Sequence, residues 1–251
     1  MELQSKTIIV TGASSGIGAA AASLFAAEGA NVVLGARRSY ELEQLVAQIT
    51  QSNGNAAFLA GDVTDEAYAA ALVDLAEKRF GGLDGAFNNA GITGDMTPIS
   101  DMDIANWHTV IETNLTSAFF AAKAQIPAIK KQGSGAIVYN SSFVGYSNGG
   151  MPGMGAYAAS KAGLIGLMQS LASDHAAEGI RINAVLPGGT KTAMAGDDPE
   201  TNDLIAGLHP LNRMAVPKEI AQAAMFLISD RSSFVIGAPM AVDGGMAVRL
   251  L

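Results

Sequence analysis

Seven short runs of apolar, often β-branched residues alternate with longer alanine-rich stretches, and this alternation constrains the fold more than any other feature of the chain. In the stretch AAAASLFAAEGA (19–30), for example, the apolar residues follow helical spacing and Gly29 can end the helix. Strands that alternate with helices predict βαβ units, hence an α/β fold with a parallel sheet covered by helices on both faces. The expected strands are TIIV (7–10), NVVLGA (31–36), AAFLAGDV (56–63), LDGAFNNAG (83–91), GAIVYNSS (135–142), RINAVLPG (181–188) and PMAVDGG (239–245).

The 251 residues contain no repeat, linker or low-complexity tract, so we expect a single domain over 1–251. Hydrophobic residues make up 49% and there are 29 glycines, which suits a large core with tight turns. The absence of cysteine excludes disulfides and thiolate metal sites. A net charge of −8 disfavours nucleic acid and anionic membranes as partners. Without a signal-peptide pattern or a long apolar run, a cytoplasmic protein is expected.

The segment IIVTGASSGIGAAAASLF (8–25) places three glycines, Gly12, Gly16 and Gly18, between the first strand and the first helix. Glycine permits a tight turn and a close approach of backbone to ligand. The free N–H groups and the dipole of a helix N-terminus favour a phosphate. The strand–turn–helix context therefore predicts a dinucleotide site, although the spacing differs from the G-x-G-x-x-G of many such sites.

Two other readings of these residues are weaker. GASSG (12–16) also fits the nucleophile elbow of α/β-hydrolases, with Ser14 as nucleophile, but that fold needs an earlier strand and a late histidine. The histidines are His108, His175 and His209, and none lies in the final strand–loop region. Their scatter gives no metal-ligand spacing, so no metal is expected.

Eight short motifs follow one another along nearly the whole chain. They are TGASSGIG (11–18), GDVTD (61–65), NNAG (88–91), ETNLTSAFF (112–120), NSSFVG (140–145), YAASK (157–161), PGGTKT (187–192) and VDGG (242–245). In this order and at these distances they resemble the short-chain dehydrogenase/reductase family. The resemblance implies one domain with a doubly wound seven-stranded sheet, and usually a homotetramer. It also implies nicotinamide-dependent oxidation of an alcohol or reduction of a carbonyl, with a small molecule as substrate.

Tyr157 and Lys161 stand four residues apart in an alanine-rich run, so a helix places both on one face. Lowering a tyrosine pKa from about 10 to about 7 takes roughly 4 kcal/mol. A nearby ammonium and the positive nicotinamide ring would supply much of it, which would let Tyr157 exchange a proton with the substrate oxygen. Read without the other motifs, the pair is a solvated helical contact worth a few tenths of a kcal/mol.

The resemblance assigns further catalytic roles. Ser142 should hydrogen-bond the substrate oxygen, whereas Ser141 should face away because strand residues alternate. Lys161 should also bind the nicotinamide ribose. Asn114, in a helix, should hold a water that links Lys161 to solvent, and a buried amide bonded to backbone is an equally plain reading of this residue.

The resemblance also places the remaining cofactor contacts. Asp62 and Val63 should lie at the adenine, although a cap at the strand–helix junction explains Asp62 equally well. VDGG is expected to be structural, at a subunit contact. Residues expected to line the cofactor site are Gly12, Ser14, Ser15, Gly16, Ile17, Gly18, Arg37, Arg38, Asp62, Val63, Asn89, Ala90, Gly91, Tyr157, Lys161, Pro187, Gly188, Thr190 and Thr192.

The end of the second strand predicts the choice between NAD and NADP. NAD-binding chains place an acidic residue there, but this chain has Ala36 followed by Arg37 and Arg38. An arginine can bind a 2′-phosphate through two hydrogen bonds and stack on the adenine. We therefore expect NADP(H) to be preferred and NAD(H) to remain possible, with Arg37 nearer the phosphate and Arg38 pointing to solvent.

Two segments should shape the substrate pocket. The stretch at about 190–215 has the weakest strand signal and is expected to form a lid or an ordinary surface insertion. Ser142 and Tyr157 are 15 apart in number, about two more than the resemblance implies, with the excess in GYSNGGMPGMG (145–155). A 3-oxoacyl-thioester reductase is the alternative within this chemistry. A silent nucleotide-binding or redox-sensing protein on the same fold is the alternative outside it.

Overall fold

A computed structural model describes residues 1–147 and 150–249. Its centre is a seven-stranded sheet in which all neighbouring strands are parallel, in the order β3-β2-β1-β4-β5-β6-β7. This confirms the doubly wound sheet predicted from the alternation of strands and helices. The strands are β1 (Thr7–Thr11), β2 (Asn31–Ala36), β3 (Asn55–Ala60), β4 (Gly85–Asn88), β5 (Gly135–Asn140), β6 (Ile180–Pro187) and β7 (Pro239–Val242).

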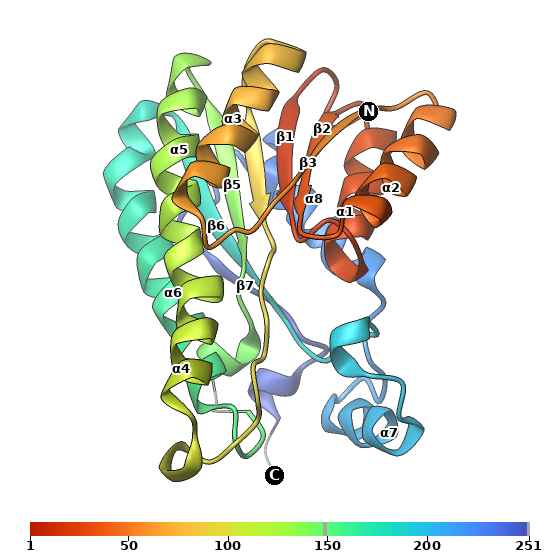
Figure 1. Cartoon of the computed structure of the whole chain (residues 1–251), viewed down its shortest axis with the longest axis vertical. Coiled ribbons are helices and arrows are strands. Elements are labelled where there is room, and N and C mark those ends of the chain that lie inside the picture. The colour runs from red at the N-terminus through yellow and green to blue at the C-terminus, as the bar shows by residue number, and fades with distance from the viewer. Residues whose placement is uncertain (148–149, 250–251) are drawn as a thin grey trace.

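Helices cover both faces of the sheet (Figure 1). Helices α1, α2 and α8 contribute to one buried cluster, and α3, α5 and α6 contribute to the other. Within the described ranges no helix is long and apolar enough to cross a membrane. The α-helices are α1 (Gly16–Ala27), α2 (Ser39–Gln51), α3 (Glu66–Phe80), α4 (Ile104–Ile111), α5 (Ser117–Lys131), α6 (Gly155–His175), α7 (Pro199–Leu208) and α8 (Pro217–Ile228).

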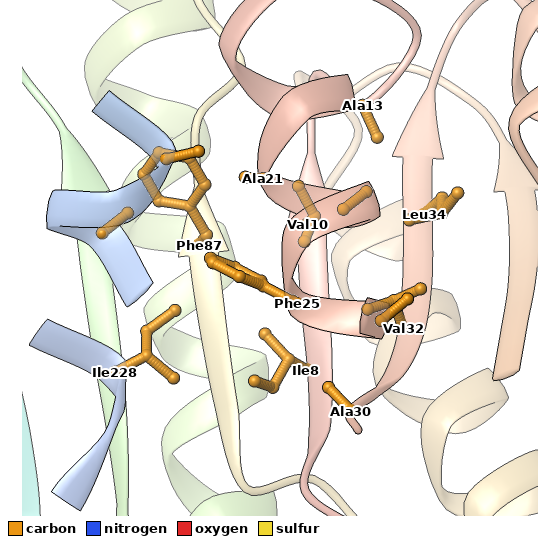
Figure 2. Packing of buried hydrophobic residues seen from close by; sticks show 14 of the residues in the cluster. Ile8, Val10, Ala13, Ala21, Phe25, Ala30, Val32, Leu34, Phe87 and Ile228 are labelled. Carbon is orange, nitrogen blue, oxygen red and sulfur yellow. The ribbon is translucent and has the colours of Figure 1, made fainter. Parts of the chain in front are cut away.

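The core under α1 shows how the sequence pattern becomes packing. Phe25 of α1 meets Phe87 of β4 edge to face, with ring centroids 6.3 Å apart, and both side chains are fully buried. Ile8, Val10 and Val32 surround them from β1 and β2 (Figure 2). A buried phenylalanine replaced by alanine costs about 3–5 kcal/mol, so this contact anchors α1 on the sheet.

The strand order brings the motifs to one edge of the sheet. Because β1 lies between β2 and β4, the chain winds away from β1 in both directions and leaves a crevice at the carboxyl ends of the strands. Thr11, Asn88, Asn140 and Pro187 are the last residues of β1, β4, β5 and β6. The segments that follow these strands therefore gather around a common crevice.

The segment between β6 and α8 leaves the sheet and returns to its starting point. Thr190 forms a parallel bridge with Ala215. The Ala215 N–H donates to Gly189 O at 2.9 Å, and the Lys191 N–H donates to Ala215 O at 2.9 Å. Residues 190 and 215 are therefore joined by backbone hydrogen bonds at the base of this segment. Helix α7, within the segment, stands apart from the sheet (Figure 1).

Candidate active site

The turn between β1 and α1 has no room for a side chain at its three glycines. Gly12 and Gly16 have φ values of +65° and +55°, which residues with a Cβ rarely adopt. A Cβ on Gly18 would lie 2.3 Å from the Gly12 carbonyl oxygen, so only hydrogen fits there. The turn therefore presents bare backbone and the N-terminus of α1, as a phosphate site requires. Ser15 precedes the helix, and Ile17 packs against the core.

Arg38 reaches this turn from the end of β2. Its Nε and Nη2 atoms donate to Ser14 Oγ at 3.2 and 3.0 Å, and Nη1 lies 3.4 Å from Glu41. Arg37 is also exposed. Arg38 thus folds back onto the glycine turn while half of its side chain stays exposed, and the assignment of Arg37 to the cofactor stays a prediction. Glu41, in the first turn of α2, pairs with this guanidinium. The long side chain of Arg38 thereby contacts both α2 and the glycine turn.

Amide side chains tie the ends of β1, β4 and β5 together. The Asn89 Nδ2 donates to Thr11 O at 3.0 Å, and the Asn140 Nδ2 donates to Asn89 Oδ1 at 2.8 Å. The backbone N–H groups of Asn89 and Ala90 both donate to the Thr11 hydroxyl. The Oδ1 atom of Asn140 is buried and has no hydrogen-bond partner within the described chain. Sequence reasoning missed this asparagine, although it begins the NSSFVG motif.

Asp62 organises the turn after β3. Its carboxylate accepts from the Thr64 N–H at 3.0 Å and from the Thr64 hydroxyl at 2.9 Å. The cap of α3 is instead Asp65, which accepts from the Ala67 N–H. Asp62 therefore stabilises the turn rather than capping the helix, and Val63 beside it packs on the core of that face.

Asn114 lies in a π-helical turn, Glu112–Thr116, between α4 and α5. Its amide pairs with the backbone of Ile92: Oδ1 accepts from the N–H and Nδ2 donates to the carbonyl, both at 2.8 Å. Nδ2 also lies 3.0 Å from the Ser160 hydroxyl. The backbone-bonded reading of Asn114 is thus present in the structure. Single π turns are frequent at functional sites, and this one carries a side chain that fixes the chain after Gly91.

The two serines after β5 face different neighbours, as strand alternation predicts. Ser141 Oγ donates to the Lys161 carbonyl at 2.9 Å and so anchors α6. Ser142 Oγ accepts from the Val144 N–H at 3.2 Å and is hydrogen-bonded to the Tyr157 hydroxyl. The backbone N–H thus orients the Ser142 hydroxyl, whose proton can point at the phenol oxygen.

Tyr157 and Lys161 come together on α6. Lys161 Nζ lies 5.6 Å from the Tyr157 ring centroid and donates to the Asn140 carbonyl at 2.7 Å. Burial lowers the pKa of Lys161 to about 8 and raises the pKa of Tyr157, while the hydrogen bond from Ser142 acts against that rise. In the protein without cofactor, burial therefore shifts the Tyr157 pKa upward, whereas the lowered value was expected from the Lys161 ammonium together with the positive nicotinamide ring.

The segment after β6 approaches the glycine turn. A Cβ on Gly16 would meet the Thr192 side chain at 3.1 Å, which brings the PGGTKT motif beside α1. Thr190 is buried, and its hydroxyl donates to Gly188 O at 3.1 Å. The Thr190 hydroxyl therefore stabilises its own loop through this hydrogen bond. His209, which sequence reasoning treated only as a scattered histidine, accepts from the Gly189 N–H at 3.0 Å.

These features fit a dinucleotide. The glycine turn is a cradle that any Cβ would fill, and Asn140 Oδ1 is a buried acceptor without a partner. Gly91 also lies close to the catalytic side chains, since its Cβ would lie 3.1 Å from Asn114 Oδ1 and 3.3 Å from Lys161 Nζ. No group of three or more acidic or histidine side chains suited to a metal ion occurs in residues 1–147 and 150–249.

Comparisons with known proteins agree with this arrangement. A family profile described as "Enoyl-(Acyl carrier protein) reductase" matches residues 12–247. Cis-4-hydroxycyclohexanecarboxylate dehydrogenase of Sinomonas cyclohexanicum is 42% identical over 96% of each chain. The 3-oxoacyl-[acyl-carrier-protein] reductase of Thermotoga maritima is 39% identical over 99% of this chain and 100% of its own.

Solved structures give the same answer for the fold and the chemistry. Levodione reductase superposes with a TM-score of 0.94 at 32% identity, covering 99% of this chain and 100% of its own. These relatives are named as dehydrogenases or reductases, and the motifs after β1, β4, β5 and β6 follow the carboxyl ends of neighbouring strands. The chain belongs to the short-chain dehydrogenase/reductase family and is an oxidoreductase that acts on CH–OH groups with a nicotinamide cofactor.

Proposed function

We propose that the enzyme interconverts a secondary alcohol and its ketone with NADP(H), using Tyr157 as general acid and base. The observation that carries this proposal is the position of Lys161, whose Nζ lies 5.6 Å from the Tyr157 ring centroid, with Ser142 beside the phenol. In this arrangement a substrate oxygen can contact both hydroxyl groups. Positioned acid–base catalysis of this kind contributes about 10²–10⁴-fold.

In the oxidative direction the alcohol hydroxyl gives its proton to Tyr157, while Ser142 donates a hydrogen bond to the substrate oxygen. A nicotinamide held by Lys161 and the segment 187–192 would supply the two-electron acceptor, which would take up the hydride from the carbinol carbon as the alcohol becomes a ketone. Tyr157 then releases its proton toward Lys161 and solvent, and reduction of a ketone follows the same steps backward.

Lys161 and Asn114 are proposed to serve this proton exchange together. Both side chains flank Gly91, as its Cβ distances indicate, so glycine leaves space between the ammonium and the amide. We assign Lys161 to the nicotinamide ribose and Asn114 to a water between Lys161 and solvent. Because Ile92 and Ser160 already hold the amide of Asn114, this residue can also keep the site rigid.

The preference for NADP(H) rests on the end of β2. Ala36 offers no carboxylate to repel a 2′-phosphate, and Arg38 already lies against Ser14 of the glycine turn. We assign the 2′-phosphate to Arg38, with Arg37 beside it. Asp62 and Val63 are assigned to the adenine, Asn89, Ala90 and Gly91 to its ribose and the pocket floor, and Pro187, Gly188, Thr190 and Thr192 to the nicotinamide and pyrophosphate.

We propose a compact apolar substrate. The segment 145–155 contains no charged residue. Gly153 lies against Met96, since its Cβ would come within 2.7 Å of the Met96 carbonyl carbon, and Gly155 lies equally close to the Ile99 side chain. Asn148 and Gly149 of this segment lie outside the described residues. The relative that acts on a hydroxycyclohexanecarboxylate supports an alicyclic alcohol as substrate.

A 3-oxoacyl thioester is the second candidate, supported by the relative of 39% identity from Thermotoga maritima. The test is a matched screen in which loss of NADPH absorbance is followed with cyclohexanone and with acetoacetyl-coenzyme A. We expect the cyclic ketone to give the higher kcat/KM. A thioester reduced faster would assign the enzyme to the alternative. Binding of NADPH without turnover of any carbonyl compound would instead identify the silent nucleotide-binding protein.

We propose one domain that assembles as a homotetramer in the cytoplasm, with the segment 190–215 as substrate lid. Membership of the family, in which the chain resembles homotetrameric proteins, supports the assembly, and Phe234 is fully exposed in the single chain. Light scattering at micromolar concentration should give about four times the chain mass of 25.6 kDa. A mass near that of one chain would contradict the assembly.

A further inference from the structure

His209 is a buried histidine outside the proposed catalytic set, and its two ring nitrogens have different partners. The residue follows α7 and is 3% exposed. Nε2 lies 3.0 Å from the Gly189 backbone nitrogen, and Nδ1 lies 2.8 Å from the Ile205 carbonyl oxygen. A backbone N–H can only donate and a carbonyl can only accept. The ring is therefore neutral. Its proton lies on Nδ1, and the lone pair of Nε2 accepts the hydrogen bond from the Gly189 N–H.

Three glycines close around this imidazole. A Cβ on Gly188 would lie 2.8 Å from Nε2, and a Cβ on Gly189 would lie 2.8 Å from Cε1. On another side a Cβ on Gly244 would lie 3.1 Å from Cδ2. The ring therefore fills a notch built from the end of β6, the end of α7 and the turn after β7. Gly188 and Gly189 of PGGTKT and Gly244 of VDGG therefore line this notch.

The hydrogen bond to Nε2 acts at the point where the chain leaves the sheet. Gly189 O accepts from Ala215 N, and the Gly188 N–H donates to Val242 O at 3.2 Å. His209 thus fixes the Gly189 N–H, while the Gly189 carbonyl binds Ala215 at the base of the segment 190–215. Loss of the hydrogen bond to Nε2 would release the backbone of Gly189 and of its neighbour Gly188. The proposed function assigns Gly188 to the nicotinamide and pyrophosphate.

We propose that His209 is a positioning residue for cofactor binding: its neutral ring holds Gly188–Gly189 through Nε2 and joins this loop to the end of α7. The inference rests on the proposed function, since it takes the 187–192 loop as part of the cofactor site. His209 does not touch the reacting atoms. It sets the backbone that does the binding.

Two substitutions separate the hydrogen bonds. In His209→Gln the side-chain oxygen can replace Nε2 as acceptor for Gly189, whereas in His209→Asn the amide nitrogen replaces only the Nδ1 donor. Dissociation constants for NADPH follow from its fluorescence. We expect His209→Asn to raise the constant at least about tenfold, equal to about 1.4 kcal/mol. His209→Gln should stay within about threefold, and kcat at saturating cofactor should change less than affinity in both.

His175→Asn is the matched control, because His175 pairs with Glu178 at the far end of α6 and should leave NADPH binding unchanged. Equal losses in His209→Gln and His209→Asn would overturn the proposal, since ring packing rather than the acceptor would then matter. Unchanged affinity in both would overturn it as well. A wild-type protein that binds neither NADPH nor NADH would instead sink the proposed function, and this assignment with it.

A measurement on the unmodified protein covers the case in which the variants fold poorly. Long-range ¹H–¹⁵N NMR spectra distinguish the two neutral tautomers, and only three histidines contribute signals. The His209 ring should carry its proton on Nδ1, and the Gly189 amide should exchange slowly with solvent. A proton on Nε2, or fast exchange at Gly189, would contradict the proposal without any substitution.

Discussion

The Lys161 ammonium donates to the Asn140 carbonyl and lies over the Tyr157 ring, with Nζ 5.6 Å from the ring centroid. A cation over an aromatic face is attracted by the ring, and the carbonyl satisfies one of its donors. The ammonium is thus held close to the phenol by the end of β5, even though burial makes its charge costly. A charge retained in so dry a place is typical of a functional site.

The depressed pKa of Lys161 predicts a pH dependence of stability. Folding lowers the pKa from 10.5 to about 8, so between these values the unfolded chain binds more protons. The free energy of unfolding of the cofactor-free protein should therefore rise with pH in this window, by roughly 1–2 kcal/mol between pH 7.5 and 9.5. Burial raises the pKa of Tyr157, which would lower stability only above pH 10. Urea unfolding across the window measures the effect.

Lys161→Met is the control for this titration, since it keeps the buried stem and removes the charge. Its stability should exceed that of wild type at pH 7.5, and the difference should shrink toward pH 9.5. Parallel pH profiles for the two proteins would show that another group titrates. The same substitution should weaken NADPH binding and reduce turnover, because Lys161 is assigned to both.

Asn114 and Asn106 provide a matched pair of amides. Asn114 pairs with both backbone groups of Ile92, and Asn106 pairs in the same way with Asp95 at 3.0 Å for each bond. Asn114 is buried, whereas the Asn106 pair is exposed. Asn114→Ala should cost about 1–3 kcal/mol, because polar groups lose partners away from water.

Turnover gives the second readout of this pair. Asn114→Ala should reduce kcat at least about tenfold, less than the 10²–10⁴-fold of a direct acid–base group because Asn114 acts through Lys161. Asn106→Ala should leave kcat unchanged and cost little stability. Equal kcat losses in the two variants would mean that loop order, rather than the place of Asn114 beside Lys161, limits turnover.

Cofactor selection can be divided between the two arginines. NADP(H) should exceed NAD(H) in kcat/KM by tenfold or more, about 1.4 kcal/mol. Arg38→Ala should remove most of this ratio, because Arg38 contacts Ser14, and Arg37→Ala should remove less. Ala36→Asp combined with Arg37→Ala should reverse the preference. Better use of NAD(H) by the unmodified enzyme would refute the assignment and leave the catalytic one intact.

Two glycines test the cradle. In Gly18→Ala the new methyl would lie 2.3 Å from the Gly12 carbonyl oxygen, so the turn must open. NADPH affinity should fall at least about tenfold. Gly166→Ala on α6 meets no atom of the described chain within 4 Å and should stabilise the helix by up to about 1 kcal/mol. Calorimetry of both variants with and without NADPH checks the prediction, which fails if Gly18→Ala binds NADPH like wild type.

Local pattern was enough to predict the sheet and the glycine turn between β1 and α1. Periodicity marks β1 and α1, and the glycines between them need the positive φ values that the structure has. Alternation placed Ser142 toward Tyr157 and Ser141 away from it, because strand side chains point to opposite faces. These features depend on neighbours in the chain, which a sequence displays directly.

Contacts between distant segments were the part that local pattern could not give. Arg38 contacts both Ser14 and Glu41, and Asn140 joins Asn89 from a different strand. His209 meets glycines from two other loops. The burial that raises the Tyr157 pKa in the protein without cofactor is likewise a property of the whole fold.

The central claim is that Tyr157 exchanges the proton with the substrate oxygen, and Tyr157→Phe tests it most directly. The substitution removes only the hydroxyl, so the ring beneath Lys161 stays in place. Stopped-flow kcat with the preferred ketone and the NADPH dissociation constant should be measured on both proteins. We predict that affinity stays within a few-fold while kcat falls at least about 100-fold. A variant with near-normal kcat would contradict the account.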